Sequence, residues 1–168
     1  MERITEQLRQ TVACWRMAPV VGALQSLRGV SLIAASSVLA ELGDLTRFDN
    51  PRHLMAFLGL VPSQYSSGPR QQMGHITKTG NSHARRMLVE AAWAYRFPAR
   101  ISRGLRDRQE NLPQTVTDIA WKAQMRLCRK YRRMAARGKL KQVITTAIAR
   151  ELSGFIWAIA REVKPTSI

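Results

Sequence analysis

A stretch rich in serine and glycine in the first half of the chain offers hydroxyl groups that could act as nucleophiles. Between Gly59 and Asn81 the serines and threonines stand beside flexible glycines. A hydroxyl attacks a phosphate more readily when cations neutralise that phosphate. The stretch therefore predicts either a phosphoryl-transfer site or a polar connector whose serines only form turns. The basic residues in or just after it are Arg70, Lys78, Arg85 and Arg86.

The local sequence defines no partner that would activate such a hydroxyl. Three histidines, His53, His75 and His83, are candidate bases, although a single histidine more often has a structural role. Paired carboxylates at metal-binding spacing are missing, because Asp44 and Asp49 flank a turn and are typical of helix caps. The residues themselves therefore predict no metal site.

The turn at residues 27–30, Leu-Arg-Gly-Val, is a candidate for phosphate binding without base readout. It joins two predicted helices, as in a helix-hairpin-helix, whose turn amides donate to a DNA phosphate. Gly29 would let the phosphate approach the backbone N–H groups. The alternative is an ordinary helical hairpin in which Gly29 only ends a helix.

Basic residues are concentrated in the second part of the chain. The 168 residues include 27 Lys plus Arg against 11 Asp plus Glu, a net charge of +16. Residues 122–141 alone hold nine basic and no acidic residues. Solvated helix faces normally mix both signs, so this run favours a nucleic-acid ligand over a merely solvated face. The candidate binding residues here are Lys122, Arg126, Arg129, Lys130, Arg132, Arg133 and Arg137.

Helices are predicted to carry nearly all of these residues. We expect an all-α domain with a helix-hairpin-helix-like element and one long irregular Ser/Gly loop, since residues 61–82 read as a loop or a short hairpin. Apolar periodicity and cap residues predict helices over 2–16, 20–27, 32–42, 51–58, 82–97, 99–110, 113–137 and 141–163.

Composition excludes several classes of protein. With 45% hydrophobic residues the chain can build a core, which argues against disorder. The longest uncharged apolar run, Val30 to Ala40, is too short to span a bilayer, and no secretory leader opens the chain, so we expect no membrane partner. Cys14 and Cys128 match no metal or disulfide spacing and are expected to be free, buried thiols in a reducing cytoplasm.

Several short motifs, taken together in this order, resemble the C-terminal domain of the DEDD-type insertion-sequence transposases. These enzymes are relatives of the Piv and MooV invertases, and some are recombinases guided by a bridge RNA. The resemblance is dense from about residue 20 to residue 93 and extends in weaker form to the C-terminus. The motifs are LRGV at 27–30, AELGD at 40–44, RF at 47–48, LMAFLGLVP at 54–62, SSG at 66–68, GHITKTGN at 74–81 and RR at 85–86.

The resemblance implies a composite active site. In such enzymes a RuvC-like N-terminal domain binds Mg²⁺ through four acidic residues, and the C-terminal domain contributes a serine that attacks the DNA phosphodiester. The family pattern Pro-x(4)-Ser-Gly falls on Ser67, between Pro62 and Gly68, with the adjacent Ser66 as the second choice. The implied partners are DNA, a structured guide RNA and further copies of the full-length protein, at the nucleoid in the bacterial cytoplasm.

This sequence departs from the family because it contains no RuvC-like domain. We therefore expect no cofactor site in this chain and no activity until another domain supplies the Mg²⁺ site. Residues 1–18 are expected to be the remnant of an inter-domain helical region, and residues 19–168 the C-terminal helical domain. The alternative function is a non-catalytic helix-hairpin-helix module that binds nucleic acid, and a basic RNA-binding scaffold comes third.

Overall fold

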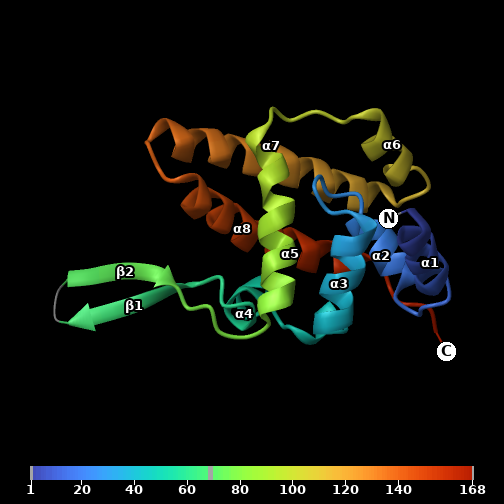
Figure 1. The fold of residues 1–168 in the computed structure, drawn as a ribbon, viewed down its shortest axis with the longest axis horizontal. Helices are drawn as coiled ribbons and strands as arrows, with labels where there is room; N and C mark the ends of the chain where they lie inside the picture. The colour runs from blue at the N-terminus through green and yellow to red at the C-terminus, as the bar shows by residue number, and fades with distance from the viewer. Residues whose placement is uncertain (1, 68–69, 168) are drawn as a thin grey trace.

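The computed structural model describes residues 2–67 and 70–167, and over these residues the chain folds into helices packed around a central helix (Figure 1). The mostly helical architecture predicted from the sequence is confirmed, and two 3-10 helices, η1 (Leu45–Arg47) and η2 (Trp93–Arg96), connect longer elements. The α-helices are α1 (Glu2–Ala13), α2 (Ala18–Leu24), α3 (Leu32–Leu42), α4 (Pro51–Phe57), α5 (Ser82–Ala92), α6 (Arg103–Gln109), α7 (Gln114–Ala136) and α8 (Lys141–Glu162).

Local capping residues set the starts of several helices. The Ser31 hydroxyl accepts a hydrogen bond of 3.2 Å from the backbone N–H three residues later, and the Asn81 side chain accepts one of 2.8 Å in the same way. The Asn50 side chain accepts two such bonds, and Pro51 follows at the first helical position, where it lacks only an N–H that the helix would not use. These caps confirm the predicted helix starts at residues 32, 51 and 82.

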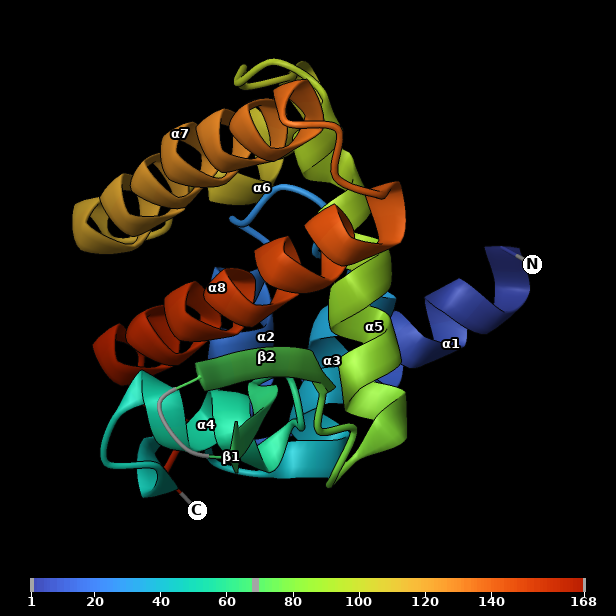
Figure 2. The same cartoon turned by 90° about the vertical axis from the view of Figure 1, so that its left-hand side faces the viewer.

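Helix α8 lies at the centre of the fold and packs against α7, α5, α4 and α2 (Figures 1 and 2). Within the described residues it is the one helix long and apolar enough to cross a membrane by length and composition. Half of its apolar window is buried inside the protein, however, and we therefore assign α8 to the core. Its fully buried side chains include Ile144, Ile148, Leu152, Ile156 and Ile159.

A two-stranded antiparallel hairpin projects from the helical body (Figure 1). Strand β1 (Pro62–Ser67) pairs with strand β2 (Arg70–Ile76), so that Pro62 lies opposite Ile76 and Ser67 opposite Arg70. The sequence predicted either an irregular loop or a short hairpin for this segment, and the structure contains the hairpin.

The two cysteines are both free, as predicted. Cys128 is buried in α7, but the prediction that Cys14 is buried is wrong. Cys14 follows the last residue of α1 in a turn that faces solvent, so its thiol lies outside the core.

Candidate nucleic-acid interface

Two glycines fix the hairpin to the helical body at what we call the hairpin root, residues 57–61 and 77–81. Gly59 and Gly80 both have positive φ angles, of 63° and 72°. A Cβ on Gly59 would overlap the backbone of Thr79, and a Cβ on Gly80 would overlap the carbonyl oxygen of Phe57. Because the two segments touch through backbone atoms at both glycines, the root tolerates no side chain at either position.

Arg85 ties the two segments of the hairpin root together. Its Nη1 donates to the carbonyl oxygens of Leu58 and Thr79, at 2.9 Å each. The guanidinium predicted to neutralise a phosphate is thus already bound at one nitrogen to the hairpin root. Lys78 and Arg86 are exposed, and Lys78 has a positive φ of 56° while its backbone N–H donates to the Gly59 carbonyl.

The backbone of Ser67 lies at the far end of β1, away from the helices (Figure 1). Its neighbour Ser66 pairs with Gln71 in the same ladder. The side chains of Ser66, Ser67 and Arg70 lie outside the part of the chain that the structure describes, as do residues 68 and 69, and with them the predicted frame residue Gly68. The predicted roles of Ser67, Ser66 and Arg70 therefore stay predictions.

The candidate base His83, next to this segment, is hydrogen-bonded to the carboxylate of Glu41. His83 Nδ1 lies 2.9 Å from Glu41 Oε1, and Asn81 Nδ2 donates to Glu41 Oε2 at 2.5 Å. Hydrogen bonds from His83 and from Asn81 hold the pKa of Glu41 below its ordinary value. Glu41 therefore joins the end of α3 to the start of α5, which directly follows the hairpin root.

A groove between α7 and α8 gathers most of the predicted basic residues. We call it the basic groove; its volume is 370 Å³. Spacings of three and four residues bring these side chains to the face of α7 away from its buried residues, such as Ala120 and Leu127. Arg132 and Arg137 do not line it. The basic groove is lined by Lys122, Met125, Arg126, Arg129, Lys130, Arg133 and Glu151.

Glu151 of α8 anchors the basic groove. Arg126 Nε donates to its carboxylate at 2.7 Å and Lys130 Nζ at 2.5 Å. Burial raises the pKa of Glu151, but the hydrogen bonds from Lys130 and Arg126 outweigh it, so the pKa lies below the ordinary value. Five cations line the groove together with this single carboxylate, which leaves the groove strongly positive and suited to a phosphate backbone.

In the turn between α2 and α3, the packing requires a glycine at position 29 for a reason that the sequence did not reveal. Gly29 has a φ of 83°, and a Cβ there would overlap the Ala91 carbonyl oxygen and lie 2.9 Å from the Ala94 Cβ. The absence of a side chain is thus required by packing against α5 and η2. The turn is also held by side chains, because Arg28 donates to the Pro98 carbonyl at 2.7 Å. Phosphate binding by the turn amides stays a prediction.

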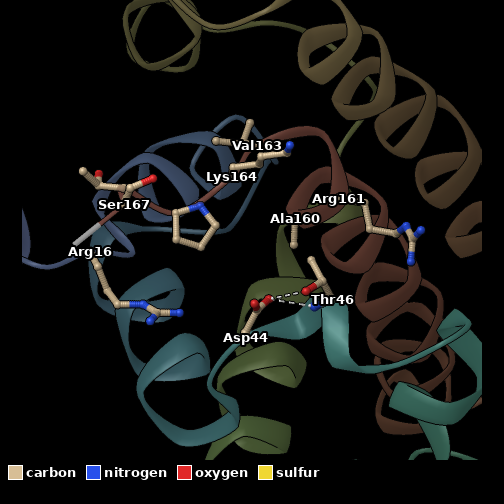
Figure 3. Close-up of a pocket in the computed structure, with 10 residues that line it drawn as sticks. Arg16, Asp44, Thr46, Ala160, Arg161, Val163, Lys164 and Ser167 are labelled. Carbon is tan, nitrogen blue, oxygen red and sulfur yellow. Dashed lines mark hydrogen bonds between the residues drawn. The ribbon is translucent and has the colours of Figure 1, made fainter.

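A cavity of 660 Å³ lies where the C-terminal segment passes the α1–α2 turn (Figure 3). Asp44 accepts hydrogen bonds from Thr46 N and Oγ1 at 2.9 and 2.8 Å, which confirms its predicted role as a cap. Figure 3 places the guanidinium groups of Arg16 and Arg161 on opposite sides, so the cations around this cavity do not converge. Among the residues that the structure describes, no three His, Cys, Asp or Glu side chains gather where they could hold a metal ion.

The fold and the basic groove define a mostly helical domain with a positively charged groove. Residues 21–105, from α2 into α6, match the Transposase IS116/IS110/IS902 family. Because that match spans half of the chain, the protein belongs to this family of insertion-sequence transposases.

Individual relatives extend the similarity along the chain. It is 49% identical over 166 residues to the putative transposase y4qE of Sinorhizobium fredii, which covers 99% of this chain and 43% of that protein. It is 44% identical over 71 residues to the transposase for insertion sequence element IS1111A of Coxiella burnetii, 42% of this chain and 20% of that one. The insertion element IS110 43.6 kDa protein of Streptomyces coelicolor is 32% identical over 99 residues, 59% of this chain and 24% of its own. The chain thus spans less than half the length of each of these bacterial relatives.

Sequence reasoning missed Glu151 and the arginines beside the α2–α3 turn. Glu151 lies in the largely apolar middle of α8, and nothing local indicates that it meets Lys130 across the α7–α8 packing. The sequence signal for the arginines beside the α2–α3 turn is the series of arginines between residues 96 and 108.

Proposed function

We propose that this domain binds DNA through the basic groove and presents Ser67 on the projecting hairpin as the nucleophile for strand cleavage. The observation that carries this proposal is the construction of the hairpin root. Gly59, Gly80 and Arg85 lock the root to α4 and α5, so the hairpin extends from a fixed base towards whatever lies beyond the helical body. A firmly held arm is what positioning of a nucleophile requires.

In the proposed reaction the Ser67 hydroxyl attacks a phosphorus atom of the DNA backbone. A bond forms between Ser67 Oγ and phosphorus, and the bond between phosphorus and one deoxyribose oxygen breaks. The hydroxyl proton passes to a base, and the departing sugar oxygen takes up a proton to become a free hydroxyl. The strand end then remains attached to the protein as a phosphoserine.

In this proposal, the Mg²⁺ implied by the resemblance and the acidic residues that would bind it lie outside this sequence. The same proposal includes a structured guide RNA and assembly of the full-length protein with further copies of itself, in the bacterial cytoplasm. The support for the RNA partner is the positive groove, which suits RNA and DNA phosphates equally.

The test is covalent capture with the full-length transposase, which carries this domain, and a radiolabelled DNA substrate. After denaturation a protein–DNA adduct is expected for the wild type and for Ser66→Ala, and none for Ser67→Ala. The two variants remove adjacent hydroxyls from the same strand, so each controls for the other. An adduct that survives in Ser67→Ala and disappears in Ser66→Ala would move the nucleophile by one residue.

An adduct that persists in the double alanine variant would refute the serine mechanism. The absence of an adduct with the wild type would instead favour the second candidate, a non-catalytic nucleic-acid-binding module. The basic groove supports that function by itself, because it lies on α7 and α8 and includes no residue of the hairpin.

A further inference from the structure

A cavity of 490 Å³ beside the α2–α3 turn is lined by three arginines and by no carboxylate. Arg28 comes from the turn itself, Arg100 from the segment between η2 and α6, and Arg108 from α6. Ser102 and the half-exposed ring of Phe97 lie at the same cavity. None of these residues belongs to the basic groove.

The three guanidinium groups have no counter-ion in the part of the chain that the structure describes, since none of them forms an ion pair. Their protein partners are neutral: Arg28 Nη1 donates to the Pro98 carbonyl at 2.7 Å, and Arg108 Nη1 to the Val30 carbonyl at 2.9 Å. Carbonyl dipoles orient a guanidinium but do not cancel its charge. The cavity therefore concentrates three positive charges.

Donor groups remain free to bind a ligand. Over the described residues, neither Nη2 of Arg28 nor Nη2 of Arg108 donates to a protein atom, and the Arg100 guanidinium has no hydrogen-bond partner. Arg108 is half-buried, and burial lowers its pKa because the charged form loses hydration. A bound anion would restore the favourable electrostatic energy that these groups lose on leaving water.

We propose that this cavity, the arginine pocket formed by Arg28, Arg100 and Arg108, binds one phosphate group of a nucleic-acid backbone. The proposal rests on the proposed function and adds a second contact to it, apart from the basic groove. Guanidinium groups present two parallel N–H donors that match two phosphate oxygens, and the Ser102 hydroxyl can donate to a third. The site stands at the turn where the sequence predicted phosphate binding, but arginine side chains rather than turn amides supply the donors.

Arg100→Ala tests the proposal with the least disturbance to the fold. The Arg100 side chain has no polar partner within the described chain, and its backbone N–H, which donates to Gln124 Oε1 at 3.2 Å, is kept in the variant. The control is Arg106→Ala, which removes the same charge from an exposed position on α6 outside the pocket. Arg100→Lys keeps the charge and removes the two-pronged geometry.

Binding of a fluorescent DNA duplex to the 168-residue chain is measured by anisotropy over a range of salt concentrations. For Arg100→Ala we expect affinity to fall about tenfold, as for one lost charge-assisted hydrogen-bonded contact. The slope of log affinity against log salt should become less negative by about 0.9, as for one lost phosphate contact. Arg106→Ala should lose clearly less, and Arg100→Lys should lie between wild type and Arg100→Ala. Equal losses in Arg100→Ala and Arg106→Ala would overturn the arginine pocket and leave DNA binding by the domain intact.

A second measurement separates a nucleic-acid phosphate from free phosphate. The side-chain Nε–H NMR signals of Arg100 and Arg108 should shift on addition of a short oligonucleotide at concentrations far below those needed with inorganic phosphate. Comparable concentrations for both would overturn the assignment to a nucleic-acid backbone. A wild-type chain that binds no duplex at all would overturn the proposed function together with this inference.

Discussion

Replacing Gly80 with alanine tests whether the hairpin root is as tightly packed as the structure indicates. A non-glycine residue at positive φ costs about 1–2 kcal/mol by itself. The new Cβ would also overlap the Phe57 carbonyl oxygen, so one of the two backbone segments must move, which adds strain of about 1–3 kcal/mol. We therefore expect a total loss of about 3 kcal/mol, or a fall in Tm of roughly 6–12 °C for a chain of this size.

The matched control is Gly138→Ala at the end of α7. Gly138 has a φ of 68°, close to the 72° of Gly80, but a Cβ there would meet nothing within 4 Å. It should therefore cost only the backbone strain, about 1–2 kcal/mol. Thermal unfolding by circular dichroism measures both variants. Equal falls in Tm for Gly80→Ala and Gly138→Ala would refute the close approach at the hairpin root.

Three further predictions concern other parts of the domain. Replacing Arg129 and Arg133 with glutamate should make the slope of log affinity against log salt less negative by about 1.8; an unchanged slope in anisotropy titrations would mean that the basic groove is only solvated. Gly29→Val should lower Tm because its side chain would overlap the Ala91 carbonyl, and a variant with wild-type Tm but weaker DNA binding would instead support phosphate binding at the turn. The pKa of Glu41 is lowered in the folded state, so the carboxylate stabilises the fold above its ordinary pKa of 4.5, and this stabilisation is lost as the pH falls through the folded-state pKa. The difference in unfolding free energy between wild type and Glu41→Gln, measured by urea denaturation, should therefore shrink in acid.

The helices were predictable because their signals are local. Ser31, Asn50 and Asn81 cap the helices that follow them within three residues, and the apolar residues of α8 repeat at helical spacing. The hairpin was harder, because β1 reads Pro-Ser-Gln-Tyr-Ser-Ser and lacks the alternation of apolar and polar residues that marks a half-buried strand. Its pairing could therefore not be distinguished from a loop.

The candidate sites were predictable in composition and not in arrangement. The run of basic residues on α7 indicated a polyanion partner, and five of its members do line the basic groove. The sequence could not indicate that Arg85 binds the carbonyls of Leu58 and Thr79, nor that Gly29 faces Ala91. Each of these contacts joins residues that only the packing of helices brings together.

One turn of α8 has a mechanical consequence for the proposed cleavage. Glu151 holds the basic groove, and three residues later Gly154 packs against Met55 and Pro51 of α4, the helix that leads into the hairpin root. The two contacts are separated by only about 4.5 Å of helical rise. A duplex that tilts or rotates α7 and α8 would therefore carry α4 and the hairpin with it as one rigid body. The distance between the DNA backbone bound in the basic groove and the β1–β2 hairpin would then stay constant.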